Sequence, residues 1–112
     1  MEAFQASTVH RPIPGDVLAA IVDESLKMPA RVWRDALTGI LAYRPRRRLA
    51  SLALPTLIAW GDRDAFCVRA EQDRVHETIP SSTLTIYEET GHAPHWEHPQ
   101  RFADDLMAFV KP

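Results

Sequence analysis

The sequence contains a single cysteine, Cys67, so no disulfide can form within the chain. It has no apolar run that approaches the roughly 20 residues needed to cross a bilayer, and its N-terminus lacks the basic start and apolar stretch of a signal peptide. The formal net charge is only -2, with both signs mixed along the chain, which gives no electrostatic basis for binding nucleic acid or an anionic membrane. We therefore expect a soluble cytoplasmic protein.

What the sequence does contain is typical of one globular domain, with 112 residues of which 46% are hydrophobic and 25% charged. We divide it into an N-terminal arm (residues 1–15), a helical segment (16–48) and a mixed segment (49–112). The first dozen residues show no periodicity, and the prolines before Gly15 are typical of an arm or loop. The basic run Arg46 to Arg48 is typical of a solvated loop or helix end.

Two amphipathic helices are predicted in the helical segment. Asp16 can cap the first, whose apolar residues recur every three or four positions until Pro29 ends it. The second extends from about Ala30 to Ala42. Pro45 stops it, because the residue before a proline is disfavoured in the helical conformation.

The mixed segment alternates strand, helix, strand and helix. The unbroken apolar run Leu57 to Trp60 is typical of a strand covered on both faces, as in a parallel sheet. A helical repeat follows over residues 68–79, the alternating residues 83–87 predict a half-exposed strand, and Pro99 opens a final helix. This order implies a right-handed crossover and two parallel strands with helices packed on the sheet.

Polar side chains follow both predicted strands, where parallel sheets have their ligand clefts. Asp62 and Asp64 come after the first strand, and His92 comes after the second, behind a Gly91 that is typical of a sharp turn. Neighbouring parallel strands bring these loops together. A carboxylate can then accept a hydrogen bond from one ring nitrogen of His92 and leave the other nitrogen to act as a base.

These loops carry a resemblance to a known family. The stretch PTLIAWGDRD, followed after one helix by LTIYEETGHAPHWEHPQRFADDLMAFV, resembles the C-terminal end of an α/β-hydrolase-fold enzyme, from about Leu54 onward. The resemblance implies that Asp64 is the triad acid, that His92 is the triad base, and that Asp62 shapes the turn. Residues 16–48 resemble the end of the cap that such enzymes insert before this point. The expected fold is therefore α/β: a partial α/β-hydrolase fold, with two parallel strands and flanking helices preceded by two cap-like helices.

The family's nucleophile does not occur in this sequence. It sits in a GxSxG elbow that precedes the acid and the base, and no serine here has glycines two residues away on both sides. Cys67 lacks such an elbow, and a lone cysteine more often packs as a small apolar group. The amides of the family's oxyanion hole belong to the same absent part.

The histidine-rich stretch has a second interpretation. His92, His95 and His98 stand three residues apart, and imidazole clusters bind zinc or nickel. The prolines in this stretch argue against a continuous helix through all three. We favour loop or helix-cap positions for His95 and His98, and we place Glu97 near the N-terminus of the last helix, where the helix dipole stabilises a carboxylate.

Three aromatic residues, Trp33, Phe66 and Trp96, are candidates for an acyl or aromatic substrate pocket, because binding sites are mostly apolar. Each of them can also be explained by ordinary packing between helix and sheet. The resemblance implies no metal and no organic cofactor, and it implies a small molecule as the substrate.

Two main functions remain open. The first is the C-terminal segment of a hydrolase for small ester, amide, lactone or similar bonds, inactive as this chain alone. The second is a non-catalytic remnant or split half that acts as an interaction module. The exposed edge of the Leu57 to Trp60 strand would then pair with a second copy or with a separate N-terminal half. A metal-binding protein built on the histidine cluster is a third alternative.

Overall fold

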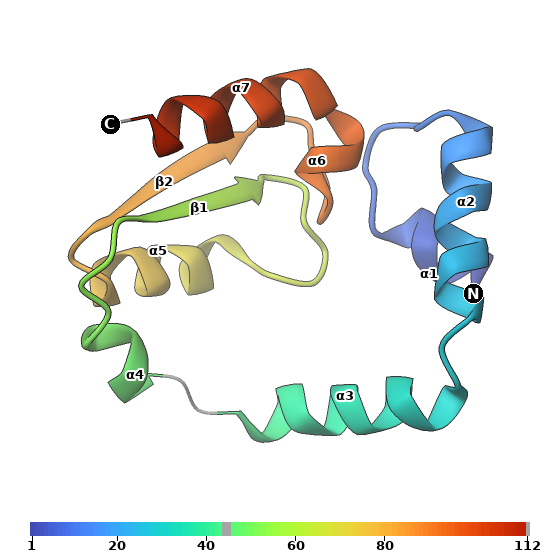
Figure 1. The fold of residues 1–112 in the computed structure, drawn as a ribbon, viewed down its shortest axis with the longest axis horizontal. Coiled ribbons are helices and arrows are strands. Elements are labelled where there is room, and N and C mark those ends of the chain that lie inside the picture. The colour runs from blue at the N-terminus through green and yellow to red at the C-terminus, as the bar shows by residue number, and fades with distance from the viewer. Residues whose placement is uncertain (44–45, 112) are drawn as a thin grey trace.

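The computed structural model describes residues 1–43 and 46–111, and at positions 46 and 47 only the backbone is described. Pro45, the predicted helix stop, and the side chains of Arg46 and Arg47 therefore lie outside the described residues. Figure 1 shows the elements in chain order, which are α1 (Glu2–Ser7), α2 (Gly15–Leu26), α3 (Ala30–Ala42), α4 (Arg46–Ala50), β1 (Thr56–Gly61), α5 (Arg69–Thr78), β2 (Ser82–Tyr87), α6 (Pro94–Glu97) and α7 (Pro99–Val110).

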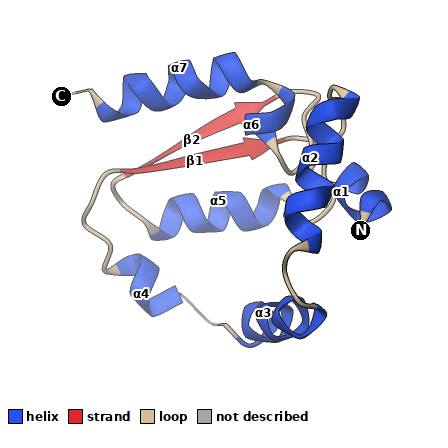
Figure 2. Ribbon diagram, turned by 45° about the vertical axis from the view of Figure 1, so that its right-hand side comes forward, coloured by secondary structure: helices blue, strands red, loops and turns tan. Residues whose placement is uncertain are grey.

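The two strands pair in parallel, from Thr56 opposite Ser82 to Gly61 opposite Tyr87. Helix α5 connects them and lies on one face of the sheet, and α7 lies on the other (Figure 2). On the α7 side, the Tyr87 ring packs against the Phe102 ring with the centroids 6.4 Å apart. These observations confirm the predicted α/β arrangement of two parallel strands with flanking helices.

The core is small and lies toward the carboxyl ends of the strands. Its buried apolar residues are Trp60, Ile79, Tyr87 and Ala93. The prediction that the run Leu57 to Trp60 is covered holds for Trp60, whereas Leu57, Ile58 and Ala59 are only half-buried. Within the described residues the sheet has two strands, so the outer edge of β1 is open and leaves these side chains partly exposed.

The N-terminal arm contains a helix that the sequence did not predict. Helix α1 has six residues, too few to show a periodic apolar face. Its stability comes from polar contacts that are partly or wholly buried: Gln5 Nε2 donates to Ser25 Oγ at 2.7 Å, and Thr8 Oγ1 donates to the Gln5 carbonyl at 2.7 Å. The arm is therefore a packed part of the fold.

The cap-like helices form where the sequence predicts them, α2 ending before Pro29 and α3 spanning Ala30–Ala42. In Figures 1 and 2, α1 and α2 lie beyond the carboxyl ends of β1 and β2, and the chain then returns through α3 and α4 to the other end of the sheet. Helices α1 and α2 thus lie near the edge where the two polar loops meet. Within the described parts of the chain, no helix combines the length and apolar character needed to cross a membrane.

Candidate active site

The loop after β1 holds the Asp64 carboxylate in a fixed orientation. Asp64 Oδ1 accepts hydrogen bonds from the backbone N–H groups of Phe66 at 2.7 Å and Cys67 at 3.0 Å. The Asp64 side chain is only 4% exposed. Two fixed amide donors leave the second carboxylate oxygen, Oδ2, directed at a partner across the loop.

That partner is His92, in the loop after β2. His92 Nδ1 lies 2.8 Å from Asp64 Oδ2, although the two residues are 28 positions apart in sequence. The His92 side chain is 45% exposed, and its ring meets the Phe66 ring edge-on with centroids 5.3 Å apart. The structure therefore brings together the two residues that the sequence selected, with the carboxylate buried and the imidazole accessible.

Two glycines allow the loops to approach this closely. A Cβ on Gly61 would lie 2.1 Å from the Gly91 carbonyl oxygen, and a Cβ on Gly91 would lie 2.7 Å from the His10 nitrogen. Gly91 lies just after the turn that follows β2, which is made at Glu88 and Glu89, and Gly91 does not take a positive φ. Gly91 is needed for space, and the left-handed residue of this loop is Glu89, with a φ of 49°.

The same two loops are joined by polar contacts. Asp62 Oδ1 accepts a long hydrogen bond from the Thr90 N–H at 3.4 Å, and the Arg63 N–H donates to the Thr90 carbonyl at 2.9 Å. Arg63 also pairs with Glu89, and its hydrogen bond and charge lower the pKa of the Glu89 carboxyl. Asp62 thus contacts the neighbouring loop, in agreement with a role in shaping the turn.

Cys67 is close to this pair without resembling an activated nucleophile. Burial raises the pKa of the Cys67 thiol, and the negative charges of Asp64 and Glu71 raise it further. The thiol form is therefore favoured at neutral pH. One ligand atom each from Asp64, Cys67 and His92 lies within 4.8 Å of the others, which makes this the one group in the described chain with the spacing of a three-ligand metal site.

The histidine cluster is not such a group, so the ligand set of the metal alternative is wrong. His95 lies in α6 rather than in a loop, and its ring contacts Trp96 and Phe102 at centroid distances of 4.9 and 5.8 Å. Burial, with a smaller contribution from the charge of His92, lowers the pKa of His95. His98 is the N-cap residue of α7, as expected.

Glu97 lies directly before the N-cap residue of α7, near the N-terminus of the last helix as expected. Its carboxylate also accepts backbone hydrogen bonds from Gly91 at 2.7 Å and, in the arm, from His10 at 3.0 Å and Arg11 at 2.7 Å. Sequence reasoning missed this role because the donors are backbone groups, two of them more than 80 positions away.

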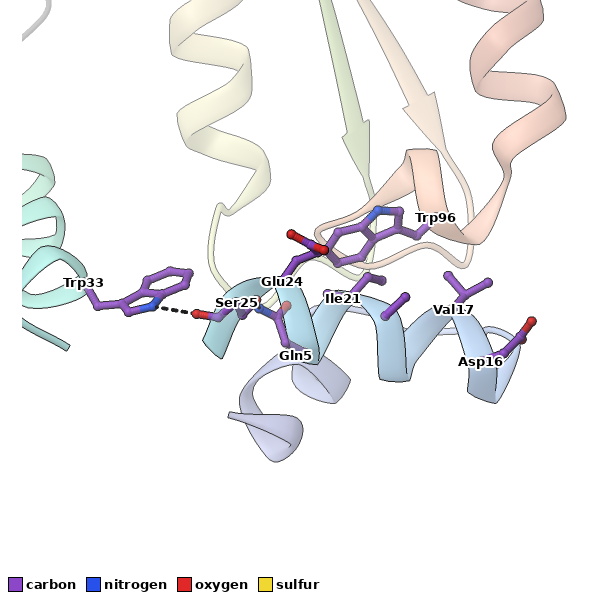
Figure 3. Close-up of a pocket in the computed structure, with 9 residues that line it drawn as sticks. Gln5, Asp16, Val17, Ile21, Glu24, Ser25, Trp33 and Trp96 are labelled. Atoms are coloured by element: carbon purple, nitrogen blue, oxygen red, sulfur yellow. Dashed lines mark hydrogen bonds between the residues drawn. The ribbon is translucent and has the colours of Figure 1, made fainter. Parts of the chain in front are cut away.

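The three candidate aromatic residues do not line one pocket. Trp33 and Trp96 line an open cavity of about 700 Å³ against α2, together with apolar residues such as Ile21 (Figure 3). The Trp33 Nε1–H donates to the Ser25 carbonyl at 3.2 Å, which fixes this wall of the cavity. Phe66 lies elsewhere, against His92.

Comparison with solved structures identifies the fold. The chain superposes over 99% of its length on 41% of an esterase from Exiguobacterium antarcticum, with a TM-score of 0.92 and 22% sequence identity. This chain has the C-terminal segment of the α/β-hydrolase fold. The superposed region includes α2 and α3, since it covers almost the whole chain.

Sequence comparison agrees. The chain is 35% identical over 83 residues to 2-hydroxy-6-oxononadienedioate/2-hydroxy-6-oxononatrienedioate hydrolase 2 from Pseudomonas putida, and the match covers 69% of the chain and 29% of that enzyme. It is 35% identical over 77 residues to a pimeloyl-acyl-carrier-protein methyl ester esterase from Aeromonas hydrophila, covering 68% and 30%. The chain thus spans less than a third of the length of these relatives. No family model matches it.

Proposed function

We propose that Asp64 and His92 are the acid and the base of a hydrolase triad that cleaves a small ester, amide, lactone or similar bond. The observation that carries the proposal is the 2.8 Å contact between His92 Nδ1 and Asp64 Oδ2, at the carboxyl ends of two parallel strands. A hydrolase and an ester-cleaving enzyme among the relatives support this class of reaction.

In the proposed mechanism, His92 Nδ1–H donates to Asp64, which fixes the tautomer and leaves Nε2 unprotonated. Nε2 takes the proton of a nucleophile hydroxyl as its oxygen attacks the substrate carbonyl carbon. The charge of Asp64 stabilises the imidazolium that forms. Nε2 then gives the proton to the leaving group as its bond to the carbonyl carbon breaks.

The nucleophile of this reaction has no counterpart in the sequence, which contains no GxSxG elbow. We propose that the 112-residue chain by itself does not turn over an ester, and that the nucleophile and oxyanion donors come from a separate part of the fold. Hydrolysis of p-nitrophenyl acetate by the chain should not exceed that of its His92→Ala variant. A burst of acyl-enzyme that depends on His92 would contradict this.

Substrate contacts are proposed for Phe66, Trp33 and Trp96. Phe66 is supported by its ring contact with His92, which places it beside the reacting atoms. Trp33 and Trp96 are supported by the apolar cavity that they share. An acyl or aromatic group is the substrate chemistry that such a lining favours.

The triad roles can be tested by replacing the corresponding segment of the Exiguobacterium antarcticum esterase with this chain. We expect the folded chimera to hydrolyse p-nitrophenyl acetate. Asp64→Asn should lower kcat by about ten-thousandfold, the size of the effect when a triad histidine loses its orienting carboxylate. His92→Ala should abolish activity, whereas the control His76→Ala, on α5, should not. Activity that persists in His92→Ala would refute the roles.

A second candidate function is an interaction module. It is supported by the outer edge of β1, and by exposed apolar side chains on α3 such as Leu37 at 57% and Ile40 at 70%. Light scattering over a range of concentrations should then show a homodimer, or a complex when an N-terminal half is supplied. A stable, well-dispersed monomer that binds no such half would exclude this function.

We also propose that the protein is cytoplasmic. The support is its single cysteine, since disulfide-forming pairs are typical of oxidising compartments. Fractionation of cells that produce the chain would test this location.

A further inference from the structure

The carboxylate of Glu97 joins two segments that are far apart in sequence. Oε1 accepts from the Gly91 N–H, and Oε2 accepts from the N–H groups of both His10 and Arg11. Hydrogen bonds to a charged acceptor are stronger than bonds between neutral groups. We call this set of three bonds the Glu97 clamp.

A second contact joins the arm to His92, the residue after Gly91. The His92 N–H donates to the Thr8 carbonyl at 2.7 Å, and Thr8 itself is only 6% exposed. The arm therefore binds the His92 amide directly through Thr8, and Glu97 joins the arm to the amide of the preceding residue, Gly91. Gly91 leaves no space for the arm to move closer.

The clamp is not explained by the local structure of α6 or α7. Glu97 is the last residue of α6, and α7 begins at Pro99 with no side-chain cap bond. All three of its amide donors lie outside both helices. The Glu97 carboxylate is half-buried and accepts three hydrogen bonds from backbone N–H groups outside α6 and α7. Its contacts therefore hold together the two segments that these donors belong to.

We propose that Glu97 is a positioning residue. It fixes the arm against the loop of His92 and so keeps the imidazole within hydrogen-bonding distance of Asp64. The importance of this alignment between His92 and Asp64 rests on the proposed function, whereas the hydrogen bonds of the Glu97 clamp do not depend on it. Because the arm leads directly into α2, the clamp also links the cap-like helices to His92. No contact of Glu97 with substrate is involved.

The test uses the full chain and the variant Glu97→Gln, whose amide cannot accept from all three donors. NMR-detected hydrogen exchange should become at least about tenfold faster at Gly91, His10 and Arg11. Exchange of the β1 and β2 amides should stay within twofold of the parent chain. The downfield proton signal of His92 Nδ1–H should broaden or disappear, which a role confined to overall stability would not cause while the strands remain protected.

The control is Glu77→Gln, at an exposed position on α5, which should change none of these signals. If Glu97→Gln does not fold, Glu97→Asp shortens the side chain and should give the same local loss. Unchanged exchange at the three amides, or an equal rise throughout the strands, would overturn the proposal. The exchange rates and the His92 proton signal are measured without catalysis. A folded esterase chimera that shows no activity would therefore refute the triad roles but not the positioning role of Glu97.

Discussion

Gly91 is a single residue at which three backbone segments meet. Its carbonyl faces Gly61, its N–H donates to Glu97, and its missing Cβ leaves room for the arm. No side chain contributes to this junction at position 91. The contact between the two polar loops and the arm therefore depends on a residue that carries no chemistry of its own.

A substitution of Gly91 by alanine should displace the arm. The added Cβ would lie 2.7 to 2.9 Å from backbone atoms of Thr8, Val9 and His10, which cannot rotate away as a side chain can. We expect a loss of about 1–3 kcal/mol in the free energy of unfolding by urea, the usual cost of overpacking.

The matched control is Gly39→Ala in α3, where a new Cβ meets nothing within 4 Å. Alanine there should stabilise the chain by about 0.5–1 kcal/mol, because glycine is unfavourable inside a helix. Equal effects of the two substitutions would contradict the close approach at Gly91.

Tyr87 should make stability depend on alkaline pH. Burial, together with its 2.6 Å hydrogen bond to Asp105 and the charge of that carboxylate, raises the pKa of Tyr87 from 10.0 to about 12. Between these values the unfolded chain loses the phenol proton while the folded chain keeps it, so the free energy of unfolding should fall as the pH rises.

Urea unfolding at about pH 9 and about pH 11, one unit below and one unit above the ordinary pKa of tyrosine, would measure this decline. It should be smaller in Tyr87→Phe than in the parent chain. Tyr43→Phe, at a residue that is 56% exposed, should leave the decline unchanged. The same decline in all three proteins would show that Tyr87 is not its source.

Individual residues also show what the sequence can reveal. The contact between Asp64 and His92 could be predicted, because a carboxylate and an imidazole can pair and their places after two strands are visible in the chain. Glu97 could not, because its partners are backbone amides, and any residue except proline offers one. Phe66, Trp33 and Trp96 could be selected as aromatic, but which of them lies beside His92 depends on packing.

At the scale of elements, the helices differ in how much of their apolar surface is covered. Ile79, the C-cap residue of α5, is 3% exposed, whereas α3 exposes Leu37 and Ile40. The C-terminal end of α5 therefore leads into the core. Helix α3 presents an apolar surface to its surroundings.

Two isoleucine substitutions would measure this difference. Ile79→Ala should lower the free energy of unfolding by about 2–5 kcal/mol, because it leaves a cavity in the core. Ile40→Ala should change it by less than about 0.5 kcal/mol, as is usual for surface positions. Thermal and urea unfolding would both measure the change in the free energy of unfolding. A large loss of stability in Ile40→Ala would mean that α3 is packed in solution.

Helices with a clear apolar periodicity could be predicted from the sequence, and short helices could not. The apolar repeats of α2, α3, α5 and α7 extend over ten residues or more, which defines a face. Helices α1 and α6 have six and four residues and are held by contacts from other parts of the chain. Their formation depends on tertiary structure, which local patterns do not encode.

At the scale of the whole molecule, the two halves of the chain have different roles. Residues from β1 onward supply Asp64 and His92, and the first half supplies the arm and α2, which lie beyond the carboxyl ends of the strands (Figure 1). The arm is joined to the loop of His92 by backbone hydrogen bonds, so it is packed against the candidate site.

The Glu97 clamp joins residues 86 and 87 positions apart, so it closes one very large loop. The entropy of closing a flexible loop grows only with the logarithm of its length, by about 0.6 kcal/mol for each doubling. Insertions or deletions between the arm and β1 would therefore weaken the closure very little. The cap-like helices can lengthen, shorten and diverge over evolutionary time, while the loop that carries His92 stays anchored to Thr8 directly and to His10 and Arg11 through Glu97.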